Sequence, residues 1–277
     1  MKKVILLLLF LSVSFTLGQV PDSLKNKWIP SFVLSAGINQ IAFTNWVKGG
    51  DNSIAWTFLG DLHYDFTGDI WSFKNSIKAA YGRSKIGSSI YKTTDNDLYI
   101  ENVAVYNFGW EVSPFVSNTI RSSIARGYNY SVTPEIETTN FFDPGYVSQS
   151  IGFTYDKYQN IITRLGFAVQ EVFASKHKEF TDPVNLSDGF KLETGIESVT
   201  DVNYKLADNI LIQSKLRLFS RFKSLDVWDV RFDNIISAQI TKIIAVNFTY
   251  LVVYEKAQSP LTQVKEGLQI GITYRLL

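Results

Sequence analysis

The sequence contains no cysteine and only two histidines among its 277 residues. Without cysteine the chain forms no disulfide and offers no thiolate ligand, and two histidines are too few for a typical transition-metal site. After the first 18 residues it also lacks heptads, helical periodicity and any apolar run long enough for a membrane-spanning helix. These absences exclude a disulfide-stapled domain and a helical membrane protein, and we expect no metal and no cofactor.

Neither sign of charge dominates the sequence. Lysine and arginine total 27, aspartate and glutamate total 26, and the formal net charge is +1. That balance gives no reason to expect a nucleic-acid partner. Hydrophobic residues make up 45% and aromatic residues 14% of the chain, so it is too apolar for disorder and long enough for one large all-β domain.

Residues 1–18, MKKVILLLLFLSVSFTLG, have the layout of a secretory signal peptide. Two lysines precede an apolar run from Val4 to Leu11, and small or polar residues follow up to Gly18. A membrane anchor is the alternative, but the run is short for a hydrocarbon core about 30 Å thick. We therefore predict a signal peptide over 1–18, a short periplasmic segment over 19–30 and a single β-barrel domain over 31–277.

The rest of the chain alternates apolar and polar residues. In the last segment the apolar positions are Leu268, Ile270, Ile272, Tyr274 and Leu276. A period of two is typical of a strand with one apolar face. The same pattern predicts about twelve strands, near 31–44, 53–66, 70–82, 97–109, 112–126, 146–156, 161–174, 189–204, 210–222, 227–241, 244–255 and 264–276. These strands are longer than is usual in globular proteins and suit a tilted crossing of a bilayer.

The connections between these strands alternate in length. Short turns such as FTGD, DKYQN and KLADN follow the even strands, and mostly longer loops follow the odd ones. An even strand number with both termini on the short-turn side predicts an up-and-down antiparallel transmembrane β-barrel in the cell outer membrane, in contact with its lipid. A soluble β-sandwich, which also buries one alternating face, is the alternative.

Aromatic residues form two groups along the predicted strands. The group near the short turns is Tyr64, Phe66, Trp71, Phe73, Tyr106, Phe108, Trp110, Tyr155, Tyr204 and Tyr274. The group toward the long loops is Trp56, Tyr81, Phe173, Phe190, Trp228, Phe232 and Tyr254. Aromatic girdles at the two membrane interfaces have this distribution.

The C-terminal residues Gln269, Gly271, Tyr274 and Leu276 have a polar-x-Gly-x-x-apolar-x-apolar spacing. This spacing resembles the terminal signal by which barrel-assembly machinery recognises its clients. Leu277 departs from it, because such barrels more often end on an aromatic residue. The resemblance implies barrel-assembly machinery as a partner.

The polar face of the predicted strands carries charges of both signs, and we expect them to line the lumen. They are Asp61, His63, Asp65, Lys74, Lys78, Glu101, Arg121, Arg164, Lys191, Glu193, Glu197, Lys215, Arg217, Arg221, Asp229, Arg231, Asp233 and Arg275, together with Gln170 and Asp201. Folding the hairpins about their turns predicts that Arg217 faces Glu197 and Asp233, that Arg221 faces Glu193 and Asp229, and that Asp61 faces Lys74. The charges form either a constriction that selects solutes or a neutralised filling of the lumen.

Catalytic candidates are few. His63 lies between Asp61 and Asp65 at alternate positions, so the three side chains line one wall rather than converge, and no serine motif lies nearby. His177, in SKHKEF, is expected on the solvated surface of a loop. We predict that the protein is not an enzyme and has no catalytic residues.

Three stretches, INQIAFTNWVKGGDNSIAW, YKTTDNDLYIE and TTNFFDPGYVSQSIGFTYD, resemble an uncharacterised Bacteroidetes family known as domain of unknown function 3078. The most specific part is the first-loop motif Asn45, Trp46, Gly49 and Gly50. The resemblance implies an outer-membrane barrel-like protein with no assigned activity or ligand. The motif either anchors the first long loop or folds inward to contact a ligand.

The function predicted first is a narrow, porin-like channel or solute-handling barrel for small polar molecules. The second interpretation is a structural or surface-interaction barrel with a charge-filled lumen. A barrel-embedded hydrolase is the third.

Overall fold

The computed structural model describes residues 25–275 except 45–49, 159, 257, 258 and 260. The predicted signal peptide over 1–18 therefore lies outside the described residues, as do Asn45, Trp46, Gly49 and Leu276. In the described part of the chain no helix has the length and hydropathy needed to cross a membrane.

Twelve strands pair in order and close into one antiparallel barrel. They are β1 (Trp28–Ile41), β2 (Ser53–Thr67), β3 (Trp71–Ile86), β4 (Lys92–Tyr106), β5 (Ser113–Ser122), β8 (Gly145–Tyr155), β9 (Ile161–Phe173), β10 (Phe190–Ala207), β11 (Ile210–Arg221), β12 (Trp228–Gln239), β13 (Ile244–Tyr254) and β14 (Gln263–Arg275). The first and last strands pair through Val33–Gly37 and Gly271–Arg275, so the barrel has no open edge. The predicted twelve-stranded, all-β antiparallel barrel is confirmed.

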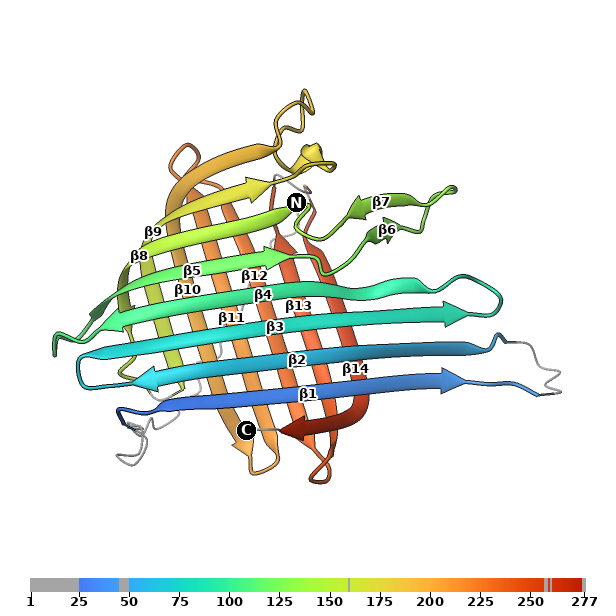
Figure 1. Cartoon of the computed structure of the whole chain (residues 1–277), viewed down its shortest axis with the longest axis horizontal. Coiled ribbons are helices and arrows are strands. Elements are labelled where there is room, and N and C mark those ends of the chain that lie inside the picture. Colours follow the sequence, from blue (N-terminus) through green and yellow to red (C-terminus); the bar gives the residue numbers. More distant parts are fainter. Residues whose placement is uncertain (1–24, 45–49, 159, 257–258, 260, 276–277) are drawn as a thin grey trace, which may run out of the picture.

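Figure 1 shows the barrel as two crossing layers. Strands β1 to β5, β8 and β9 run across the front, and β10 to β13 run steeply behind them. Strand β10 curves from one layer into the other, and β14 bends at its C-terminal end to lie beside β1. The two layers therefore meet at two corners, one at β10 and one at β14.

Paired glycines lie near both corners. Gly152 of β8 pairs with Gly166 of β9, and Gly37 of β1 pairs with Gly271 of β14. A Cβ on Gly166 would overlap the carbonyl oxygen of Ile151, and one on Gly271 would overlap that of Ala36. Glycine permits such close backbone approach where a barrel bends sharply.

The two faces of each strand differ sharply in chemistry, as β9 shows. Leu165 and Phe167 point outward and are 56% and 64% exposed, whereas Arg164 and Gln170 point inward and are 5% and 3% exposed. The outward apolar face continues around the barrel through Leu34, Phe58, Ile77, Val116, Ile151, Leu192, Ile236, Phe248, Leu268 and Ile270. The barrel thus has an apolar outside and a polar inside, the arrangement of outer-membrane-type barrels.

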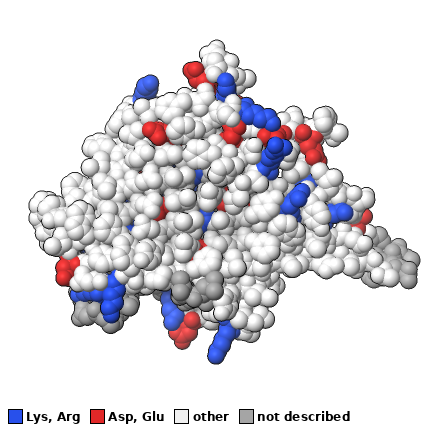
Figure 2. Space-filling model, viewed as in Figure 1, with Lys and Arg blue, Asp and Glu red and all other residues white. Residues whose placement is uncertain are grey.

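Exposed rings cluster at the short-turn end of the front layer. Trp28 stacks on Tyr64 at 4.6 Å between ring centroids, and Trp71 meets Tyr106 edge-on at the same distance. Tyr106 contacts Phe108, which stacks on Trp110. Toward the loop end, Trp56 contacts Tyr81 and Phe173 contacts Phe190. Figure 2 shows charged side chains gathered toward the two ends of the barrel, with an almost uncharged band between them.

Several strand boundaries differ from those predicted from the sequence. Strand β1 begins at Trp28 rather than near residue 31, and β3 and β4 extend into the expected long loop, to Ile86 and from Lys92. The long loop after β5 contains a hairpin that the pattern did not predict, formed by β6 (Gly127–Asn129) and β7 (Ile136–Thr139). A 3-10 turn, Lys178–Phe180, lies in the loop after β9.

Candidate functional site in the barrel lumen

The alternation of the strands places the predicted lumen residues on the inner face. Those with described side chains are Asp61, His63, Asp65, Lys74, Lys78, Glu101, Arg121, Arg164, Lys191, Glu193, Glu197, Lys215, Arg217, Arg221, Asp229, Arg231 and Asp233. Arg275 pairs with Val33 through the backbone, and its side chain lies outside the described set. Most of the seventeen belong to networks of ion pairs.

A first network, here called the middle network, consists of Glu101, Arg164, Asp201 and Lys215. The Glu101 carboxylate accepts hydrogen bonds from Arg164 at 2.8 Å and from Lys215 at 2.5 Å. Asp201 lies 3.0 Å from Arg164 and 3.2 Å from Lys215. Because β4 and β11 are five positions apart in the strand order, the contact between Glu101 and Lys215 crosses the lumen.

A second network, the outer network, lies nearer the long loops. Arg217 donates to Glu197 at 2.7 Å and to Gln170 at 3.0 Å. Arg121 of β5 reaches Glu255, just after β13, at 3.3 Å. Strands β5 and β13 are six positions apart in a ring of twelve, so this ion pair joins opposite walls.

Arg221 lies between two carboxylates on neighbouring strands. Its guanidinium is 2.7 Å from Glu193 and 2.7 Å from Asp229, and it donates two hydrogen bonds to each. Lys191 approaches Glu193 at 2.6 Å. The charges of these four side chains thus neutralise one another within the barrel wall.

The register of the hairpins differs from the predicted one. Glu197 lies opposite Phe219, and Arg217 lies opposite Val199 and Arg231. Asp208 and Asn209 form the β10–β11 turn, and a bulge between Lys205 and Ala207 shifts the pairing. A bulge adds one residue to one strand, which an alternating pattern does not reveal. The predicted registers are wrong by two residues.

Long side chains still make three of the predicted ion pairs diagonally. Arg217 contacts Glu197, and Arg221 contacts both Glu193 and Asp229. The predicted contact between Arg217 and Asp233 is wrong, because Asp233 pairs with Arg231 of its own strand at 2.9 Å.

The predicted pairing of Asp61 with Lys74 is also wrong. Asp61 lies opposite Lys78, at 3.8 Å between charged atoms. The reason is the turn, in which the Gly68 N–H donates to the Trp71 carbonyl and closes a four-residue connection instead of a two-residue one.

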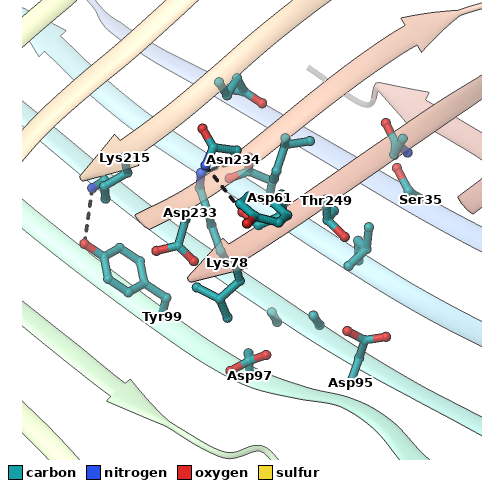
Figure 3. Close-up of a pocket in the computed structure, with 18 of the residues that line it drawn as sticks. Ser35, Asp61, Lys78, Asp95, Asp97, Tyr99, Lys215, Asp233, Asn234 and Thr249 are labelled. Atoms are coloured by element: carbon teal, nitrogen blue, oxygen red, sulfur yellow. Dashed lines mark hydrogen bonds and ion pairs between the residues drawn. The ribbon is translucent and has the colours of Figure 1, made fainter. Parts of the chain in front are cut away.

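Between the two layers lies a cavity of about 270 Å³, here called the chamber. Its charged lining residues are Asp61, Lys78, Asp95, Asp97, Lys215, Arg231, Asp233 and Lys265. Figure 3 labels six of them, Asp61, Lys78, Asp95, Asp97, Lys215 and Asp233, around the cavity, and Lys215 points at the Tyr99 hydroxyl, 3.2 Å away. Lys265 of β14 lies 2.5 Å from Asp95 and 3.6 Å from Asp97 of β4. The chamber offers donors and acceptors of both charges to a small polar molecule.

Sequence reasoning missed Asp95, Asp97, Lys265 and Glu255. A fourth strand that begins near residue 97 leaves Asp95 in a loop, whereas β4 begins at Lys92, and Asp95 and Asp97 extend the inward series of Tyr99 and Glu101 in steps of two. This continued alternation is the signal in the sequence that could have identified Asp95 and Asp97 as lumenal. Nothing local marks Glu255, because only closure of the barrel brings it to Arg121.

His63 occupies the wall of the front layer. Its Nε2 lies 2.9 Å from Asp61 Oδ1, and the register places Ser31 and Ser76 opposite it. Among the described contacts, neither serine hydroxyl is hydrogen-bonded to the imidazole. No three metal-ligating side chains are grouped suitably for a metal ion in the described ranges.

The long loops hold a separate polar cluster around Asp143. Its carboxylate accepts backbone N–H bonds from Ser175 at 3.0 Å, Lys176 at 2.9 Å and His177 at 3.2 Å. Burial alone raises the pKa of Asp143, but the N–H donors of Lys176 and His177 outweigh it and hold the pKa below the usual range. His177 is consequently 5% exposed, with Nε2 3.5 Å from Glu137, so its expected placement on the solvated surface is wrong.

The other predicted motifs are only partly described. Gly50 of the first-loop motif has φ of 125°, which favours glycine, and its three companions fall outside the described residues. Gln269, Gly271 and Tyr274 lie on β14, where Gln269 and Gly271 face inward and Tyr274 is 56% exposed.

A family model described as "Protein of unknown function (DUF3078)" matches residues 38–128, which confirms the resemblance noted in the sequence. The match includes the first two of the three stretches, and the third, residues 138–156, lies beyond it. No curated protein is significantly similar in sequence.

Solved outer-membrane barrels are similar in structure. The translocator domain of the autotransporter NalP from Neisseria meningitidis is 9% identical, with a TM-score of 0.38, 91% of this chain and 91% of that chain covered. The β domain of the Bordetella autotransporter BrkA is 10% identical, with a TM-score of 0.28 and coverage of 90% and 98%. OmpT of Vibrio cholerae is 7% identical, with a TM-score of 0.30 and coverage of 90% and 96%. The strand pairing of the chain itself, rather than these similarities, defines the barrel.

Proposed function

We propose that this protein is an outer-membrane barrel that handles small polar solutes in a closed-off lumenal chamber and is not a permanently open pore. The exposed apolar face of the strands supports contact with membrane lipid, because a soluble protein rarely exposes so large an apolar surface. The proposal rests above all on the chamber, a cavity of about 270 Å³ with carboxylates and cations on facing walls. Zwitterions and small polyols match such a mixed lining.

The cross-lumen ion pairs support a closed resting state. Arg121 and Glu255 join opposite walls near the long loops, and Glu101 joins Arg164 and Lys215 farther in. Mixed-sign ion pairs narrow a lumen without favouring one ion charge. A solute can then pass through the lumen only if at least the Arg121–Glu255 ion pair opens.

The same ion pairs favour the second candidate, a structural or surface-interaction barrel. If neither the middle network nor the outer network ever opens, the charged interior serves only to hold the two layers together. We propose no catalytic role, since the position of His63 provides a carboxylate partner but no hydrogen-bonded nucleophile among the described residues.

Planar-bilayer conductance separates these candidates. We expect small, infrequent current steps from the wild-type protein and larger, more frequent steps from the Arg121→Ala/Glu255→Ala double variant, which removes both charges of the outer pair. The matched control is Arg126→Ala/Glu137→Ala, because that ion pair, 3.8 Å long, lies in the loop after β5, outside the barrel wall. Silence from both the wild type and the double variant, with the fold intact by heat-modifiable gel migration, would favour the structural barrel.

A further inference from the structure

A row of amide side chains interrupts the apolar outer face. Asn75 of β3, Asn102 of β4, Asn118 of β5 and Gln149 of β8 are consecutive cross-strand partners, and all four face outward. Apolar residues lie two positions to either side along each strand, as Val116 and Ile120 do around Asn118. The row therefore runs through the part of the barrel that would face hydrocarbon.

Three of these amides form no hydrogen bond with the residues that the structure describes. Asn75 donates to the Tyr64 carbonyl at 2.7 Å, but no described residue is hydrogen-bonded to the side chains of Asn102, Asn118 or Gln149. Asn234, an outward asparagine on the back layer, does have hydrogen-bond partners. Its side chain accepts a hydrogen bond from the Ser214 hydroxyl at 2.5 Å and donates one to the Tyr250 carbonyl at 3.4 Å. An amide without a hydrogen-bond partner in an apolar medium costs about 2 kcal/mol or more.

The surface over the row is hollow. A cavity of about 660 Å³ is lined by all four amides and by apolar side chains, including Val116 and Ile151. Its lining also includes Phe167 and Phe222, which lie 6.1 Å apart and are 64% and 46% exposed. A hollow and a projecting pair of rings thus adjoin on one face.

We infer that this face binds a second copy of the same chain, related by a two-fold axis that passes near Asn118. An amide carries both donors and acceptors, so an amide row is complementary to itself. In an isologous interface the same patch of both chains meets. The amides of one chain can then hydrogen-bond to those of the other, and the Phe167 and Phe222 rings of each chain can fill the hollow of the other. Lipid chains offer no hydrogen bonds to the row. The inference rests on the proposed membrane placement.

The absence of cysteine makes a direct test simple, because a single introduced thiol reports only on its own contacts. In outer-membrane preparations of the full-length protein, Asn118→Cys should give a disulfide-linked dimer on mild oxidation, since a residue near a two-fold axis meets its own copy. The matched control is Asn234→Cys. Asn118 lies five residues after Ser113 and Asn234 five residues before Gln239, both counted from short-turn ends, so the two have similar depth.

We expect at least ten times more dimer from Asn118→Cys than from Asn234→Cys. The Asn102→Leu/Asn118→Leu/Gln149→Leu variant should be monomeric by light scattering in detergent while the wild type is dimeric. Equal cross-linking of both cysteine variants, no cross-linking of either, or an adduct to a different polypeptide would overturn the inference. Fractionation of the cells that express Asn118→Cys, before the membranes are isolated, distinguishes the two failures. Uncross-linked protein in the membrane fraction rejects only the dimer, and protein in the soluble fraction rejects the proposed membrane placement.

Discussion

At the scale of single residues, Asp143 organises the long loops. It lies between the β6–β7 hairpin and β8, and its two oxygens accept backbone N–H bonds from Ser175, Lys176 and His177 of the loop after β9. One buried carboxylate thus connects two loops that are distant in sequence. An ionised carboxylate is a stronger acceptor than a neutral amide, so its charge is important for this contact.

The substitution Asp143→Asn should loosen the loop after β9. We expect a loss of about 1–3 kcal/mol of local stability, because the amide keeps one acceptor oxygen and turns a donor toward a backbone N–H. Hydrogen exchange of residues 174–189, followed by mass spectrometry, should show faster exchange than in wild type, with Asp226→Asn in the β11–β12 loop as the control.

The pH dependence of this loop has a defined sign. The pKa of Asp143 is lower in the folded protein than the usual value of about 3.9, so the stabilisation is complete above that value and is lost as the pH falls through the lower, folded pKa. Protection corrected for intrinsic exchange should stay constant from pH 7 to about pH 5 and fall only below the usual carboxyl pKa of about 3.9. Protection that stays unchanged at still lower pH would contradict this sign.

At the scale of strands, the corners of the barrel depend on glycine. At Gly152 and Gly166 the backbones of β8 and β9 approach too closely for a side chain on the inner face. Gly60 of β2 is different, because a Cβ there would meet only the Phe32 ring at 3.9 Å. Glycine is therefore required at this close approach of β8 and β9 and is not required at position 60.

The substitution Gly166→Ala should destabilise the barrel by about 1–3 kcal/mol, because the methyl group forces the two backbones apart. Gly60→Ala is the matched control and should leave stability nearly unchanged. Urea unfolding in lipid vesicles, followed by the heat-modifiable gel band, measures both. Equal midpoints for the two variants would show that the corner tolerates a side chain.

At the scale of the whole molecule, Glu101 connects the walls of the barrel. It is 8% exposed and neutralises Arg164 of β9 and Lys215 of β11 from its position on β4. Removing one partner of a buried ionic group leaves the remaining charges uncompensated.

Glu101→Gln should therefore lower the free energy of unfolding by about 3–5 kcal/mol. The control is Glu266→Gln, whose exposed carboxylate lies on the outward face of β14. Urea titration in vesicles measures both, and an unchanged midpoint for Glu101→Gln would mean that water in the lumen already screens the network.

The sequence by itself determined the strand number, the closed antiparallel order and most of the charges that face inward, because a period of two is a local property of each strand. It also predicted that Arg221 contacts both Glu193 and Asp229, since long side chains tolerate a register error of two residues. Only the tertiary structure decided the registers, the close backbone approach at the paired glycines, and contacts such as Arg121 to Glu255 and Lys265 to Asp95. Bulges and turn lengths shift the pairing by amounts that alternation does not encode, and opposite walls meet only when the ring closes.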